Sequence, residues 1–218
     1  MEELIRATAQ QVFNELGASI ALYEKHVDEC ADVLISLESR LETVELAAFK
    51  GILRTSLMLD YINLDLCAAY RQYLSTELSA KYDKRQAMTK VNCIISEGYK
   101  KIYGFNESGH KKSFWNTQIK TAVEYIGVLD EEFRDIEVEL QGYASSDVFD
   151  KEMRDFSIHY DEDPMKVFNM LASLSAEEVT TRCSTFLKLL NRITGFVWML
   201  LKLMRTKLEI IYDLSNKN

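Results

Sequence analysis

Glycine and proline are scarce in this chain of 218 residues, which contains 8 glycines and 1 proline. Proteins rich in β-sheet need turn residues at their strand connections, so this composition argues against a sheet-based fold. Hydrophobic residues make up 47% of the chain and charged residues 28%, which is typical of a folded globular protein. We therefore expect an all-α fold: an up-and-down bundle of long helices, more than roughly 65% helical against a globular average of about a third.

The chain also lacks the cysteine spacing of a metal or redox motif. No two of its cysteines form a Cys-x-x-Cys pair, and each lies on or near an apolar helical stripe: Cys30, Cys67, Cys93 and Cys183. This placement favours buried free thiols over metal ligands or disulfide partners. His26 and His110 have no second ligand at a dependable spacing, so we expect both to be surface histidines. The sequence predicts no metal site and no cofactor.

Long hydrophobic runs are missing as well. The longest apolar run covers residues 196–201, whereas a helix that spans a bilayer needs roughly 20 such residues. The chain opens on Met1 and two glutamates, which is unlike the basic and then apolar start of a secretory leader. These features predict a cytoplasmic protein without a membrane segment.

Positive charge is in deficit, because 26 lysines and arginines face 34 aspartates and glutamates and the formal net charge is −8. Broad electrostatic binding of nucleic acid needs many phosphate-neutralising cations, so this balance argues against it, although a small RNA cleft needs only a few. Acidic side chains concentrate in residues 129–143. Such a run is usually a solvated helix face, and its functional alternative is a docking surface for a basic protein partner.

Apolar residues recur at helical spacing almost throughout the chain. The pattern predicts helices over about residues 2–25, 28–44, 46–78, 84–103, 114–127 and 129–143, then a short helix from 164 and a final helix from about 176 to 214. Asp28 is the expected cap of the second helix, and Pro164 suits the first position of the short helix. Ser175 and Glu178 have capping-box spacing. Residues 105–112 read as a loop, and Gly51 as a point of close helix packing.

The most distinctive stretch covers residues 151–164. It places Arg154 and His159 five positions apart, with four residues between them, Asp155 after the arginine and Tyr160 after the histidine. This arrangement resembles the Arg-x4–6-His signature of the HEPN superfamily, whose members are small all-helical proteins. The resemblance implies one all-helical domain over residues 1–218, with a HEPN-like core at 46–214 and an N-terminal helical layer at 1–45.

The resemblance also implies a function. Many HEPN proteins are metal-independent RNases that pool two copies of the motif at a homodimer interface, and others are inactive binding relatives. By this resemblance His159 is the acid/base and Arg154 contacts the phosphate and stabilises the transition state. Asp155 would orient these two residues, and Tyr160 would stack on an RNA base or hold the imidazole. A toxin–antitoxin or phage-defence setting is the implied context.

Elementary geometry leaves two readings of the motif open. In one continuous helix Arg154 and His159 would lie roughly 140° apart, so they meet only if the helix ends before His159 or if two protomers share one site. In the structural alternative, Arg154 pairs with Asp150 one turn earlier and His159 caps a helix end. The rival function is accordingly a non-catalytic helical interaction module with no enzymatic activity.

The length of the final helix bears on assembly. Its apolar stripe from Val179 to Ile211 is about 48 Å long, whereas a domain of this size is about 35 Å across. The excess fits either an elongated monomer or a helix partly covered by a second copy of the chain.

Overall fold

The computed structural model describes residues 2–76, 80–146, 164–173 and 175–215. The chain is 88% helical, and its described residues contain no strand. This confirms the all-α fold that the scarcity of glycine and proline predicted.

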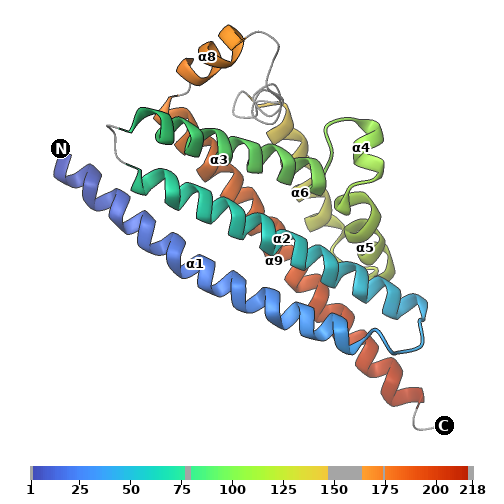
Figure 1. Cartoon of the computed structure of the whole chain (residues 1–218). Helices are drawn as coiled ribbons and strands as arrows, with labels where there is room; N and C mark the ends of the chain where they lie inside the picture. The colour runs from blue at the N-terminus through green and yellow to red at the C-terminus, as the bar shows by residue number, and fades with distance from the viewer. Residues whose placement is uncertain (1, 77–79, 147–163, 174, 216–218) are drawn as a thin grey trace.

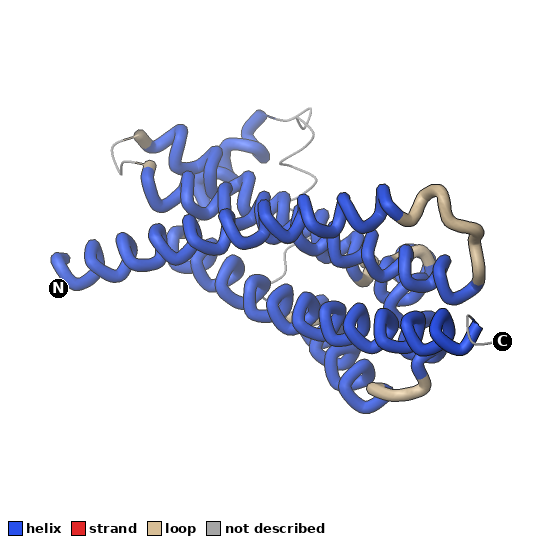
Figure 2. Tube along the Cα trace, turned by 90° about the horizontal axis from the view of Figure 1, so that it is seen from below, coloured by secondary structure: helices blue, strands red, loops and turns tan. Residues whose placement is uncertain are grey.

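Three long helices form the body of the molecule: α1 (Glu2–Ser36), α2 (Val44–Ser75) and α9 (Ala176–Ser215). Helix α2 packs against both α1 and α9, and α3 (Lys81–Ile102) packs against α2 and α9 (Figure 1). The long helices run along one axis, so the described ends of the chain lie at opposite ends of an elongated molecule (Figure 2). Helix α2 therefore contacts each of the other long helices.

Shorter elements cover one side of this body. In chain order they are α4 (Glu107–Lys111), a π-helical turn η1 (Trp115–Ile119), α5 (Lys120–Ile126), α6 (Asp130–Ala144) and α8 (Pro164–Ser173). The turn η1 and α5 pack against α2, and α5 and α6 pack against α9.

Local sequence signals set several helix ends. The Thr43 side chain accepts a hydrogen bond from the backbone N–H of Leu46 at the start of α2. At the start of α9, the N–H of Glu178 donates to Ser175 Oγ at 3.1 Å, and the N–H of Ser175 donates to the Glu178 carboxylate at 3.2 Å. This pair is the predicted capping box. Gly127 ends α5 in the left-handed conformation, with φ 73°, which glycine adopts without steric cost.

Aromatic side chains fill the core between the short elements and the long helices. Trp115 is fully buried and stacks on Phe133, with ring centroids 4.7 Å apart. Tyr99 is also fully buried, and its hydroxyl donates to the backbone oxygen of Leu140 at 3.0 Å. The acidic face of α6 is solvated as expected, because the side chains that α6 buries are all uncharged: Phe133, Ile136, Leu140 and Tyr143.

Three expectations about local structure were wrong. The chain does not break near Asp28, because α1 continues unbroken through residues 25–28. Residues 105–112 are not all loop, since Asn106 caps the short helix α4 with its side chain. The helix expected over about residues 28–44 does not form as a separate element, because α1 extends to Ser36 and α2 begins only at Val44.

A search of the described helices finds none that is long and apolar enough to cross a membrane.

Candidate functional site

The sequence-predicted site lies outside the part of the chain that the structure describes. Arg154, Asp155, His159 and Tyr160 all fall within residues 147–163. Their mutual geometry is therefore not part of the site described below.

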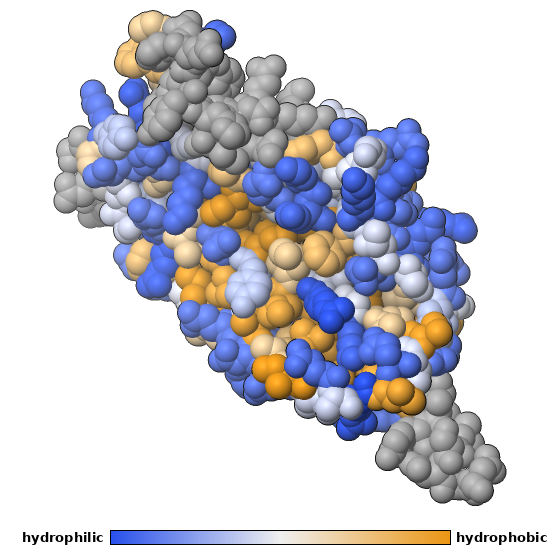
Figure 3. All heavy atoms as spheres, turned by 45° about the vertical axis from the view of Figure 1, so that its right-hand side comes forward, coloured by the Kyte–Doolittle hydropathy of each residue, from blue (hydrophilic) through white to orange (hydrophobic). Residues whose placement is uncertain are grey.

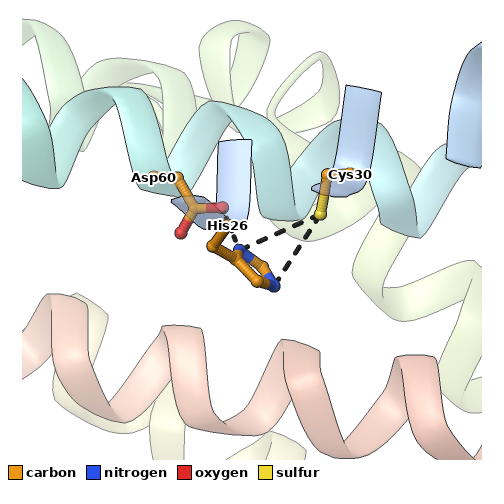
Figure 4. A group of neighbouring side chains, drawn as sticks. All are labelled: His26, Cys30 and Asp60. Carbon is orange, nitrogen blue, oxygen red and sulfur yellow. Dashed lines mark hydrogen bonds and ion pairs between the residues drawn. The ribbon is translucent and has the colours of Figure 1, made fainter. Parts of the chain in front are cut away.

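Within the described residues, three side chains with metal-ligating and acid–base chemistry meet where α1 packs on α2. They are His26 and Cys30 of α1 and Asp60 of α2 (Figure 4). His26 Nδ1 and Asp60 Oδ2 lie 2.5 Å apart and share a hydrogen bond. Cys30 Sγ lies 3.9 Å from Nδ1 and 3.8 Å from Nε2 of the same ring. The imidazole therefore contacts both the carboxylate and the thiol.

Helix geometry explains why these side chains converge. His26 and Cys30 are four residues apart on α1, so they share one face of the helix. That face is held against α2 by buried neighbours such as Tyr23, which is 9% exposed. Asp60 lies near the middle of α2, the most enclosed helix, and its side chain is fully buried. The helix pairing, and not any local motif, assembles the cluster.

Burial controls the ionisation of the cluster. It raises the pKa of the Asp60 carboxyl above its usual value, and the hydrogen bond from His26 offsets part of that rise. The pKa of the Cys30 thiol is raised to about 11, mainly by burial and further by the negative charge of Asp60. Cys30 is therefore a protonated thiol at neutral pH.

The ionisation state of Cys30 decides whether the cluster can act as a catalytic cysteine site. A Cys–His–Asp order resembles the arrangement of a nucleophile with its base, but a catalytic cysteine needs a lowered thiol pKa. Cys30 has a raised pKa and is only 4% exposed. The cluster is therefore not an activated cysteine nucleophile. It remains a set of nitrogen, sulfur and oxygen donors gathered at one point.

The cluster opens onto a groove between α1, α2 and the second half of α9. The groove has a volume of about 700 Å³, and His26, Glu29 and Cys30 contribute to its wall. Six apolar side chains form most of the remaining lining: Val33, Leu37, Phe49, Leu53, Leu201 and Leu208. The charged residues of the lining are three cations, Arg40, Lys202 and Arg205, and one further carboxylate, Glu209. Trp198 of α9 lies against the imidazole, with ring centroids 4.9 Å apart. The site thus has a solvent-facing side and a fully buried side.

A second, smaller cleft of about 450 Å³ lies between α6 and α9. Ser146 lines it and is the last described residue before the 147–163 segment. Lys188 and Arg192 bring positive charge to the cleft, and Arg192 forms ion pairs with Glu132 and Glu139.

His26 and His110 were expected to be surface histidines, but both are half-buried and have partners. The His26 side chain is 22% exposed and is hydrogen-bonded to a buried carboxylate. His110 Nδ1 lies 3.0 Å from the backbone oxygen of Tyr103, and its ring packs on the Tyr103 ring. The expectation of free buried thiols is confirmed for Cys30, Cys67 and Cys183, whereas Cys93 is half-buried.

Sequence reasoning missed the cluster because Asp60 is 34 positions away from His26 on another helix. The one local signal was the spacing of His26 and Cys30, which places both on a single helix face. Nothing local in the sequence points from that face to Asp60.

Comparison of the chain with models of protein families, with curated proteins and with solved structures finds no match.

Proposed function

We propose that this chain is a HEPN-like, metal-independent endoribonuclease that acts in the cytoplasm as a homodimer. The observation that carries the proposal is the Arg-x4-His sequence at Arg154 and His159, followed in sequence by Asp163 and by Pro164, the first residue of α8. The all-helical fold agrees with the architecture that the HEPN resemblance implies. A toxin–antitoxin or phage-defence role belongs to the same proposal.

The chemistry of the two residues suits RNA cleavage without a metal ion. One group must take the proton of the ribose 2′-hydroxyl, and another must protonate the leaving 5′ oxygen. Histidine titrates near neutral pH, so His159 from each of two protomers fills these two roles. Negative charge gathers on the phosphorane oxygens, where the guanidinium of Arg154 is a fixed bidentate partner. Asp155 orients these residues, and Tyr160 offers an RNA base a stacking surface.

Two features of the described residues support this proposal. Ser146, the last described residue before the motif segment in sequence, lines the α6–α9 cleft together with Lys188, a local cation of the kind that a small RNA site needs in an otherwise acidic protein. Helix α8, which follows the motif segment in sequence, exposes Met165 by 58% and Phe168 by 55% in the isolated chain. Exposed apolar side chains on a helix are a surface that a second copy would cover.

A second candidate function rests on the acidic helix α6. Its outer face exposes carboxylates along its length: Asp130, Glu131, Asp135 and Glu139. In the space-filling view, hydrophobic and hydrophilic side chains are mixed over the face turned forward (Figure 3). A non-catalytic module would use α6 to bind a basic protein partner.

The deciding experiment compares wild type with His159→Ala and Arg154→Ala on a structured RNA. We expect each substitution to lower cleavage by about 10²–10⁴-fold, through loss of proton transfer or of charge stabilisation. EDTA should leave the activity intact, and the products should end in 2′,3′-cyclic phosphate. A wild type that cuts no RNA, together with variants that melt several degrees lower, would replace the nuclease with the binding module.

A further inference from the structure

The His26–Cys30–Asp60 cluster leaves a buried charge incompletely satisfied. The Asp60 side chain has no exposed surface, and its one ion-pair partner among the described residues is His26. Its Oδ1 atom is buried and, within that part of the chain, has no hydrogen-bond partner. A buried carboxylate is costly unless its oxygens are paired or coordinate a metal ion. The second oxygen of Asp60 therefore needs an explanation that the hydrogen bond to His26 does not give.

The donor types around Asp60 indicate which ion would satisfy it. The cluster offers an imidazole nitrogen, a thiol sulfur and a carboxylate oxygen, one ligand atom from each residue within 4.8 Å of the other two. Ca²⁺ and Mg²⁺ prefer sites built from oxygen alone. A borderline-soft ion such as Zn²⁺ accepts nitrogen, sulfur and oxygen together.

The distance between the thiol sulfur and the imidazole is close to that of a tetrahedral zinc site. Zn–N bonds of about 2.0 Å and Zn–S bonds of about 2.3 Å put adjacent ligand atoms roughly 3.2–3.8 Å apart. Cys30 Sγ lies 3.8 and 3.9 Å from the two imidazole nitrogens, close to this range. The 2.5 Å contact between His26 Nδ1 and Asp60 is a hydrogen bond, so loading requires the ring to move away from Asp60 by about 1 Å.

The surroundings leave room for that movement and for entry of the ion. His26 is the most exposed of the three side chains and faces the groove between α1, α2 and α9. Asp60 and Cys30 form the buried side of the cluster. An ion reaching the cluster from the groove would meet three protein ligands and keep one coordination position toward solvent, which water would occupy.

We propose that His26, Cys30 and Asp60 bind one Zn²⁺ ion, which joins α1 to α2. This site is separate from the proposed nuclease chemistry at Arg154 and His159, which requires no metal.

Binding of Zn²⁺ releases the thiol proton of Cys30. Cys30 is held as a thiol in the metal-free protein, because burial and the Asp60 charge raise the pKa of its sulfur to about 11. Binding of Zn²⁺ replaces the S–H bond with an S–Zn bond, and the thiol proton leaves to solvent. The thiolate and the Asp60 carboxylate together carry two negative charges, which balance the two positive charges of the ion. The loaded site is therefore neutral.

The test uses the full chain, stripped with EDTA, dialysed and titrated with ZnCl₂ in a calorimeter. We expect one ion per chain and a rise in Tm of several degrees, because an ion that binds only the folded state stabilises it. Cys30→Ala and His26→Ala should each weaken binding at least about 10-fold. Cys67→Ala is the matched control, because Cys67 is an equally buried free thiol outside the cluster, and it should leave the affinity unchanged.

Co²⁺ supplies a readout that does not depend on any variant. The wild-type complex should show the near-ultraviolet charge-transfer band of a thiolate bound to cobalt and the visible bands of a tetrahedral ion. Cys30→Ala should lose the charge-transfer band, and Cys67→Ala should keep it. The proposal is overturned by a wild type that binds no zinc, by zinc affinity that survives Cys30→Ala, or by a cobalt complex without the thiolate band. RNA cleavage is assayed separately, so failure of the zinc site and failure of the nuclease are distinguishable.

Discussion

Two glycines on neighbouring helices differ in what surrounds them. A Cβ at Gly98 of α3 would lie 2.9 Å from Ile62 Cγ2 and 3.3 Å from Phe186 Cζ, both atoms of buried side chains. A Cβ at Gly195 of α9 would meet no atom within 4 Å. Gly98 is therefore required by packing, whereas Gly195 only weakens its helix.

Alanine substitutions at these two positions should change stability in opposite directions. Replacing a helical glycine with alanine contributes about 1 kcal/mol through propensity. Gly195→Ala should therefore raise the free energy of unfolding by about 0.5–1 kcal/mol. Gly98→Ala adds an overpacking cost of about 1–3 kcal/mol, so its net effect should be a loss. Urea unfolding of both variants checks the signs, and a stabilised Gly98→Ala would mean that Ile62 and Phe186 have room to move.

At Gly51, unlike Gly98, the atom that a Cβ would meet belongs to a flexible side chain. The sequence indicated close packing there, and a Cβ would meet Gln118 Oε1 at 2.2 Å. The obstructing atom is the end of a flexible side chain that is only partly buried. Alanine at this position should therefore disturb the fold less than alanine at Gly98.

The buried thiol of Cys67 makes stability depend on pH in the alkaline range. Its ordinary pKa is 9.0, and burial raises this pKa to about 11 in the folded protein. Between these values the unfolded chain binds fewer protons than the folded chain, so the free energy of unfolding falls as pH rises. The slope approaches about 1.4 kcal/mol per pH unit for this one thiol.

Cys67→Ala should remove that contribution. Urea unfolding from pH 7 to pH 10 should give a shallower decline for the variant than for wild type. The difference at pH 7, where the thiol is protonated in both states, isolates the packing cost of the substitution. Parallel declines would contradict the assigned rise in the pKa of Cys67.

At the scale of single elements, the start of α9 depends on its capping box. Ser175 and Glu178 satisfy each other's backbone N–H groups there. Ser175→Ala should lower the free energy of unfolding by about 1 kcal/mol, because one N–H of the first turn loses its partner. Ser184→Ala on the same helix is the control, since its hydroxyl bonds only a backbone oxygen in mid-helix and should cost nothing. Equal losses from both substitutions would show that the cap is dispensable.

Most helix positions were predictable because local signals and packing agree. Gly127 and the Ser175–Glu178 pair mark helix ends that the sequence predicted and the structure keeps. The predicted break near Asp28 failed for a physical reason. Polar residues there suggest a loop, but Tyr23 and Cys30 face α2, and this tertiary contact holds α1 continuous.

The candidate site was less predictable than the fold. His26 and Cys30 are identifiable as residues on one helix face, whereas their partner Asp60 comes from a different helix. Helical periodicity states which side of a helix is buried but not which positions of two helices lie opposite each other. The motif at Arg154 and His159 is the opposite case: the sequence identifies it, but it lies outside the residues that the structure describes.

At the scale of the whole molecule, the proposed nuclease requires two chains. A two-fold homodimer brings together the same surface of each protomer, so a site on the axis receives one His159 from each. Light scattering should then find about 50 kDa, twice the 25.2 kDa mass of the chain. A particle of 25.2 kDa at micromolar concentration would remove the basis of the composite site but would leave the fold unchanged.

Mixed dimers test whether both imidazoles act in one reaction. Wild type and His159→Ala are unfolded together in equal amounts and refolded, which gives wild-type, mixed and doubly substituted dimers in proportions of about 1:2:1 if exchange is random. If one imidazole is the base and the other the acid, only the wild-type dimers cut RNA, and cleavage falls to about a quarter of that of pure wild type. If each chain carries a complete site, cleavage falls only to about a half. Arg134→Ala, on an exposed position of α6, is the control and should give undiminished cleavage at every mixing ratio. A linear dependence on the wild-type fraction would refute the shared site, whereas a dependence on its square would establish that two copies of His159 serve one phosphate.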